Sequence, residues 1–116
     1  MPSVIDSADW LSDLAAFRGE WQGGAHGSAV CVIADRLEGP GGGPRLHRHP
    51  YPEVFIVRRG TGLFTVGDEQ ILATEGQIVV VPPGVPHKFT NPGPDRFEKS
   101  ASTKAAASRP SGWNKR

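Results

Sequence analysis

Four side chains suited to binding a metal ion fall into two short stretches of the chain. His47, His49 and Glu53 lie within seven residues of one another, and His87 follows 34 residues after Glu53. Residues two apart on a β-strand point to the same face, so both imidazoles of His47-Arg48-His49 can converge on one point. Three imidazoles and one carboxylate suit a first-row divalent ion that keeps open positions for water or substrate. A closed structural zinc site would normally use thiolates instead.

Isolated histidines also occur by chance, so each candidate residue has a competing interpretation. A lone His-x-His pair is weak evidence for a metal, whereas its combination with Glu53 and a later His87 favours one. His26 lies between glycines, and we predict a surface loop histidine there. Cys31 lies in a β-branched run, which indicates a small buried apolar residue rather than a nucleophile.

The elements that must position these residues are short strands separated by turns. The chain has 15 Gly and 11 Pro in 116 residues, with β-branched runs between them, which indicates a single all-β domain. Trp10, Leu14 and Phe17 recur with helical spacing, so one short helix is predicted within 7–17. A glycine-rich loop is expected over 19–27, and the two-residue turn Gly67-Asp68 should join two strands. The predicted strands are 28–36, 46–49, 53–57, 63–66, 70–73, 77–81 and 85–91.

The glycines and prolines around the ligands make the pattern specific. One stretch reads Gly41-x5-His47-x-His49-x3-Glu53-x6-Gly60, and a second reads Gly76-x5-Pro82-x-Gly84-x2-His87-x3-Asn91. These spacings resemble both motifs of the cupin superfamily, in particular its small single-domain, conserved-barrel members. The resemblance implies a double-stranded β-helix, or jelly-roll, barrel that commonly pairs as a homodimer. It also implies that His47, His49, Glu53 and His87 bind one divalent transition metal (Fe, Mn, Ni, Zn, Co or Cu).

Two classes of function fit such a pocket. One is a metal-dependent enzyme acting on a small oxygenated organic molecule, either as a dioxygenase or as an isomerase, lyase or cyclase. The other is a non-catalytic metal-binding or small-ligand-binding module, such as a sensor. Candidates for an apolar pocket wall are Phe55, Val57, Phe64 and Phe89, for which core packing is the competing interpretation. Arg45 and Tyr51 could reach a substrate anion, or could simply face solvent.

Charge and composition divide the chain into an N-terminal segment (1–27), a barrel (28–95) and a tail (96–116). Residues 1–95 carry seven Lys/Arg and eleven Asp/Glu, and this acidic excess argues against a nucleic-acid surface. The single cysteine excludes an intrachain disulfide. With no secretory signal and no membrane span evident, we expect a soluble cytoplasmic protein.

The tail carries six Lys/Arg and one Glu and offers no evident final strand. A natural flexible basic tail is one interpretation. The other is a frameshift: loss of one nucleotide just before the Phe97 codon would have replaced a strand with apolar residues at positions 100 and 102. Such a chain would lack its usual last strand and expose a sheet edge. The coding DNA decides between the two.

Overall fold

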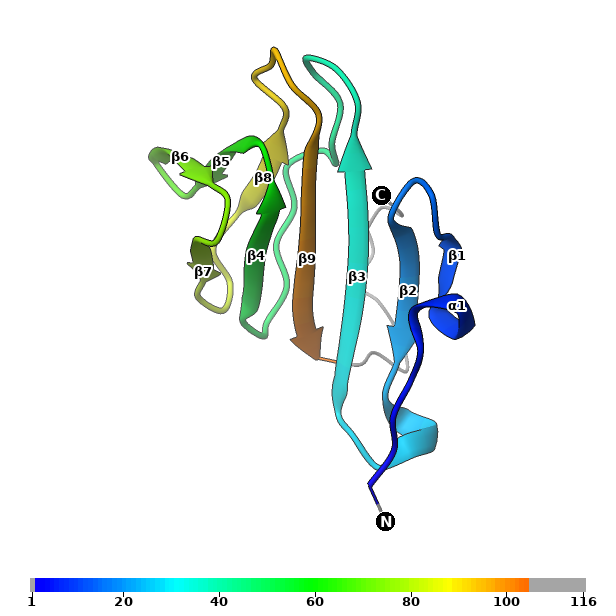
Figure 1. Cartoon of the computed structure of the whole chain (residues 1–116). Coiled ribbons are helices and arrows are strands. Elements are labelled where there is room, and N and C mark those ends of the chain that lie inside the picture. The colour runs from blue at the N-terminus through cyan, green and yellow to red at the C-terminus, as the bar shows by residue number, and fades with distance from the viewer. Residues whose placement is uncertain (1, 105–116) are drawn as a thin grey trace.

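A computed structural model describes residues 2–104 as two antiparallel sheets, of six and three strands (Figure 1). The six-stranded sheet has the order β1-β2-β3-β9-β4-β7, and the three-stranded sheet has the order β6-β5-β8. The elements are α1 (Ser7–Trp10), β1 (Leu11–Asp13), β2 (Arg18–Gln22), the 3-10 turn η1 (Gly24–His26), β3 (Val30–Leu37), β4 (Glu53–Arg59), β5 (Thr61–Val66), β6 (Glu69–Thr74), β7 (Ile78–Val81), β8 (His87–Thr90) and β9 (Phe97–Lys104). Among the described residues, no helix has the length and apolar character needed to cross a bilayer. The predicted all-β jelly-roll fold is confirmed.

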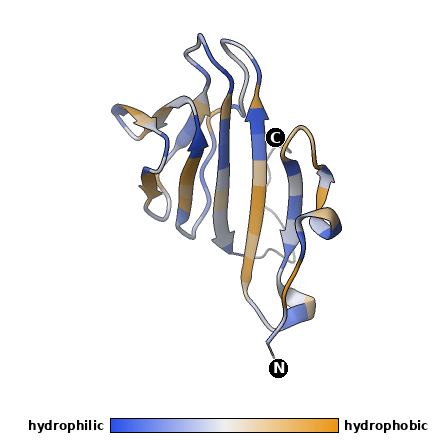
Figure 2. Cartoon of the chain, in the orientation of Figure 1, coloured by the Kyte–Doolittle hydropathy of each residue, from blue (hydrophilic) through white to orange (hydrophobic). Residues whose placement is uncertain are grey.

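The core lies between the two sheets and is built by period-two alternation along the strands. On β4, Phe55 and Val57 are buried while Ile56 between them is exposed. Four phenylalanine rings form the centre of the core, with neighbouring centroids 5.2–6.1 Å apart: Phe55, Phe64, Phe89 and Phe97. Figure 2 shows how hydrophobic and hydrophilic residues are distributed along the strands, with β3 hydrophobic in its first part and hydrophilic just before its last residue, Leu37.

Six of the predicted strands each overlap one observed strand, β3 to β8. The predicted turn at Gly67-Asp68 joins β5 to β6, and Gly67 has the positive φ of 60° that favours glycine. The predicted strand 46–49 is wrong, because only an isolated bridge between His47 and His87 forms there. Pro44, Pro50 and Pro52 flank this segment, and proline cannot donate a ladder hydrogen bond.

The predicted helix within 7–17 is wrong beyond Trp10. The helix has only four residues, and the chain then continues as β1, which pairs with β2. Gly19 therefore lies within a strand, not in the predicted loop. A Cβ at Gly19 would lie 2.6 Å from the carbonyl oxygen of Trp10, so the close approach of the two segments requires glycine. Leu14, which the helical pattern would bury, is 58% exposed.

The expectation that residues 96–116 contain no strand is also wrong. Strand β9 pairs with β3 on one side and with β4 on the other, so it lies inside the six-stranded sheet. Its sequence is poor in apolar residues, but the two flanking strands hydrogen-bond to its backbone on both sides. Such pairing overrides the low intrinsic β propensity of its residues. The remainder of the predicted tail, 105–116, lies outside the described residues. The frameshift stays a hypothesis.

Candidate metal centre

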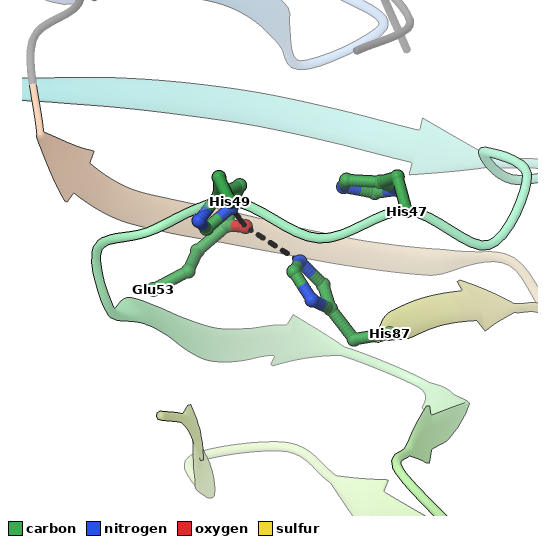
Figure 3. Close-up of side chains that lie close together, drawn as sticks. All are labelled: His47, His49, Glu53 and His87. Atoms are coloured by element: carbon green, nitrogen blue, oxygen red, sulfur yellow. Dashed lines mark hydrogen bonds and ion pairs between the residues drawn. The ribbon is translucent and has the colours of Figure 1, made fainter. Parts of the chain in front are cut away.

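The four predicted ligand residues come together in the structure (Figure 3). The nearest nitrogen or oxygen atoms of His47, His49, Glu53 and His87 all lie within 4.8 Å of one another. His47 and His49 lie on the segment between β3 and β4, Glu53 is the first residue of β4, and His87 is the first residue of β8. The cluster therefore joins the two sheets, and it can hold a metal ion.

Backbone hydrogen bonds fix the segment that carries His47 and His49. The N–H of His47 donates to the carbonyl of His87 at 3.1 Å, and the N–H of His87 donates back to His47 at 2.8 Å. The N–H of Gly84 donates to the carbonyl of His49 at 2.8 Å. This explains the Pro-Pro-Gly turn before β8: it brings the chain alongside the histidine segment just before His87.

Each of the three imidazoles is oriented by a backbone carbonyl two residues away. The Nδ1 atoms lie 2.8 Å (His47), 2.7 Å (His49) and 2.9 Å (His87) from the carbonyl oxygens of Arg45, Tyr51 and Val85, respectively. A carbonyl can only accept, so each Nδ1 carries the proton. In a neutral imidazole this makes Nε2 a lone-pair acceptor, the form that binds metals.

Glu53 gives the cluster its chemical character. Its Oε1 lies 3.1 Å from the Nε2 of His49 and 3.1 Å from the Nε2 of His87. The carboxylate is fully buried, and the side chains of His49 and His87 are 1% and 2% exposed. Acceptors that face one another out of contact with water are unfavourable unless positive charge lies between them. The donor set therefore fits a bound cation, either a metal ion or protons on the imidazoles.

His47 is partly exposed as a residue, whereas the other three members of the cluster are buried. The Nε2 atom of His47 is itself buried. Arg45 is exposed and contributes its carbonyl to His47, whereas Tyr51 is half-buried with its ring against His49.

The four candidates for an apolar wall are all buried in the core, as the competing interpretation had it. Phe55 also contacts the cluster, since its ring centroid is 6.2 Å from that of His87 in an edge-on arrangement. Cys31 is buried as predicted. His26 lies in η1 with its ring 5.5 Å from that of Trp21, outside the cluster.

Two features near the site had no signal in the sequence. Thr103 on β9 donates its hydroxyl to the carbonyl of Pro52 at 3.0 Å and so anchors the residue before Glu53. Lys99 on β9 and Asp35 on β3 form a buried ion pair. Both depend on β9, which the residue pattern does not predict, so neither contact could have been found from residue spacing.

Solved structures of other proteins have a similar fold. A Bacteroides fragilis cupin protein has a similar fold (TM-score 0.66, 20% identity, 84% of this chain and 82% of that chain). A cupin 2 conserved barrel domain protein from Rhodopseudomonas palustris is 26% identical, with a TM-score of 0.64 over 71% of this chain and 56% of that one.

Curated relatives match shorter stretches. The xanthan biosynthesis protein XanB of Xanthomonas campestris is 45% identical over 49 residues, which are 42% of this chain and 10% of that protein. The mannose-1-phosphate guanylyltransferase of Klebsiella pneumoniae is 38% identical over 55 residues, 47% of this chain and 12% of the enzyme. The chain thus spans about a tenth of the length of these relatives.

The family model described as "Cupin domain" matches residues 38–98, which are more than half of the chain and contain the whole cluster. The chain belongs to the cupin domain family.

Proposed function

We propose that this protein binds one first-row divalent metal ion through His47, His49, Glu53 and His87, and that it is a metal-dependent enzyme acting on a small oxygenated organic molecule. The observation that carries the proposal is the convergence of buried acceptor atoms: the Nε2 atoms of two carbonyl-held imidazoles face the same carboxylate oxygen. Mixed nitrogen and oxygen ligands suit Fe, Mn, Co, Ni, Cu or Zn.

The residues at the site have defined tasks in this proposal. The three backbone carbonyls hold the imidazoles in the metal-binding tautomer, and Glu53 supplies the negative charge that offsets part of the charge of the ion. Substrate would approach past His47, the one member of the cluster that is partly exposed. The metal, when bound, would supply Lewis-acid or redox chemistry, for a reaction of the dioxygenase class or of the isomerase, lyase and cyclase class.

Metal content tests the site. We expect tag-free wild-type protein to carry close to one equivalent of a transition metal by elemental analysis, and His47→Ala and His87→Ala to lose most of it. His26→Ala is the matched control, because His26 lies outside the cluster. Unchanged metal content in both cluster variants would refute the proposal.

Turnover distinguishes the enzyme from a non-catalytic module. Protein loaded with each metal in turn would be tested against small hydroxy acids, diketones and sugar phosphates, the last because a relative is named for mannose 1-phosphate. Product formation that disappears in His87→Ala supports the enzyme. Stable metal binding without turnover of any of these compounds favours a binding or sensor module. The homodimer and the cytoplasmic location stay predictions.

A further inference from the structure

The five residues from His49 to Glu53 form a short, stiff connection between two members of the cluster. They read His49-Pro50-Tyr51-Pro52-Glu53. Each proline fixes its own φ and restricts the residue before it, so His49 and Tyr51 both have limited backbone freedom. The hydroxyl of Thr103 donates to the carbonyl of Pro52 and ties the end of this connection to β9.

Within this connection, Tyr51 contacts His49 in two ways. Its backbone carbonyl accepts the Nδ1 proton of His49 at 2.7 Å. Its side chain stacks on the imidazole, with ring centroids 4.3 Å apart and planes inclined by only 12°. The hydrogen bond sets the direction of the imidazole in its plane, and the stack sets the orientation of the plane itself. Together they restrict the two side-chain torsions of His49.

We propose that Tyr51 is a positioning residue for the metal centre: its ring holds the plane of His49 against the cluster, so that Nε2 is directed at the ion before the ion arrives. This inference rests on the proposed metal site. It assigns Tyr51 a role through His49 rather than a direct contact with a substrate anion. Loss of a partner that orients a metal-binding histidine typically weakens metal affinity by about 10–100-fold.

Titration of the metal-free protein with Co²⁺ tests the proposal, with the visible absorption of the bound ion as the readout. We expect Tyr51→Leu to bind Co²⁺ at least about 10-fold more weakly than wild type, because leucine is apolar but cannot stack on the imidazole of His49. The visible absorption bands of the bound Co²⁺ should also shift. Tyr51→Phe keeps the ring and should bind within about threefold of wild type. Affinity in Tyr51→Leu equal to that of wild type would overturn the proposal.

A matched control separates positioning from general destabilisation. Trp21 also contacts a histidine, His26, with ring centroids 5.5 Å apart, but outside the cluster. Trp21→Leu should lower the thermal midpoint of the metal-free protein and leave Co²⁺ affinity unchanged. If it weakens affinity as much as Tyr51→Leu does, Tyr51 acts only through stability and the proposal fails.

A metal-independent readout covers the case in which the binding data are ambiguous. In the metal-free protein, the Nδ1 proton of His49 should exchange with solvent faster in Tyr51→Leu than in wild type, because an imidazole that is no longer held by the stack leaves the carbonyl of Tyr51 more often. Equal exchange rates of this proton in the two proteins, measured by NMR, would overturn the proposal. Absence of Co²⁺ binding by wild type would instead refute the proposed function, so the two failures are distinguishable.

Discussion

Lys99 and Asp35 face each other across β9 and β3 inside the barrel, with Nζ and Oδ2 3.0 Å apart. The Lys99 side chain is fully buried, and that of Asp35 is 6% exposed. The ammonium group also lies over the ring of Phe89, 4.4 Å from its centroid. A charged pair therefore occupies positions that the alternation of β3 and β9 assigns to the core.

This pair should be strongly coupled. Removing one partner leaves a buried charge uncompensated, which typically destabilises by about 3–5 kcal/mol, whereas replacing both with apolar residues is often close to neutral. We expect Lys99→Met and Asp35→Leu each to lower the free energy of unfolding by that amount, and the double variant to lower it by much less than the sum. Urea unfolding measures all three.

The double variant keeps this prediction testable even if a single variant does not fold. Additive effects in the complete cycle, or a double variant less stable than either single variant, would show that the two charges do not depend on each other.

Glu53→Gln separates metal binding from folding. In the metal-free protein the amide can donate a hydrogen bond to one Nε2, whereas the carboxylate can only accept, so the variant should be at least as stable as wild type. Loss of a partner that orients a ligand typically weakens metal affinity by about 10–100-fold. Because Glu53 is itself a proposed ligand, the metal affinity of Glu53→Gln should fall by more than this. Thermal unfolding with a chelator and with added Zn²⁺ tests both statements.

In wild type, Zn²⁺ at about 100 times its Kd should add about 2.7 kcal/mol to the free energy of unfolding. Glu53→Gln should lose most of the resulting rise in thermal midpoint. A metal-free variant that melts well below wild type would contradict the prediction.

The candidate site could be predicted from sequence because its information is local. The ligand types, their spacing and the flanking glycines are all visible within 41–60 and 76–91. The same stretches predicted the barrel. The orienting carbonyls of Arg45, Tyr51 and Val85 could not be predicted, because every residue has a carbonyl and only the backbone path shows which one faces an imidazole.

The errors fall where long-range pairing overrides local pattern. The helical spacing of Trp10, Leu14 and Phe17 extends past the point at which β1 begins to pair with β2. Strand β9 escaped prediction because its core-facing positions include Lys99, Ala101 and Thr103 instead of large apolar residues. Pairing on both sides defines it as a strand, and no local signal reports that pairing.

Substitutions at Ser100 and Ser102, on the outward face of β9, test how much cross-strand side-chain pairs contribute to stability. Ser102 is paired with Val54 and Val32, and Ser100 is paired with Ile56. Valine at both positions would add β-branched side chains beside apolar ones. We expect Ser100→Val with Ser102→Val to raise the free energy of unfolding by up to about 1 kcal/mol per site.

The double alanine variant is the matched control, because it removes both hydroxyls without adding a β-branched side chain, and it should be neutral or slightly destabilising. A valine variant less stable than wild type would contradict the prediction.

Reading the coding DNA around the Phe97 codon is a separate test of the frameshift hypothesis: if no one-base insertion restores apolar residues at positions 100 and 102, that hypothesis is wrong.

The loop that delivers the chain to His47 contains a matched pair of glycines. Gly41 and Gly43 have nearly the same positive φ, 94° and 97°. A Cβ at Gly43 would collide with the carbonyl oxygen of Phe89, whereas a Cβ at Gly41 would meet nothing within 4 Å. Both alanine variants carry the strain of a left-handed conformation, about 1–2 kcal/mol. The difference between their free energies of unfolding therefore reports the collision at Gly43 alone.

We therefore expect Gly43→Ala to be at least about 1 kcal/mol less stable than Gly41→Ala in urea unfolding, because the backbone at Phe89 must shift. Phe89 lies two residues after His87 on β8, so this shift should also weaken metal binding in Gly43→Ala. Gly41→Ala should keep wild-type affinity. Equal stability of the two variants would show that the loop relaxes without displacing β8, and the close approach at Gly43 would then have no role in positioning the cluster.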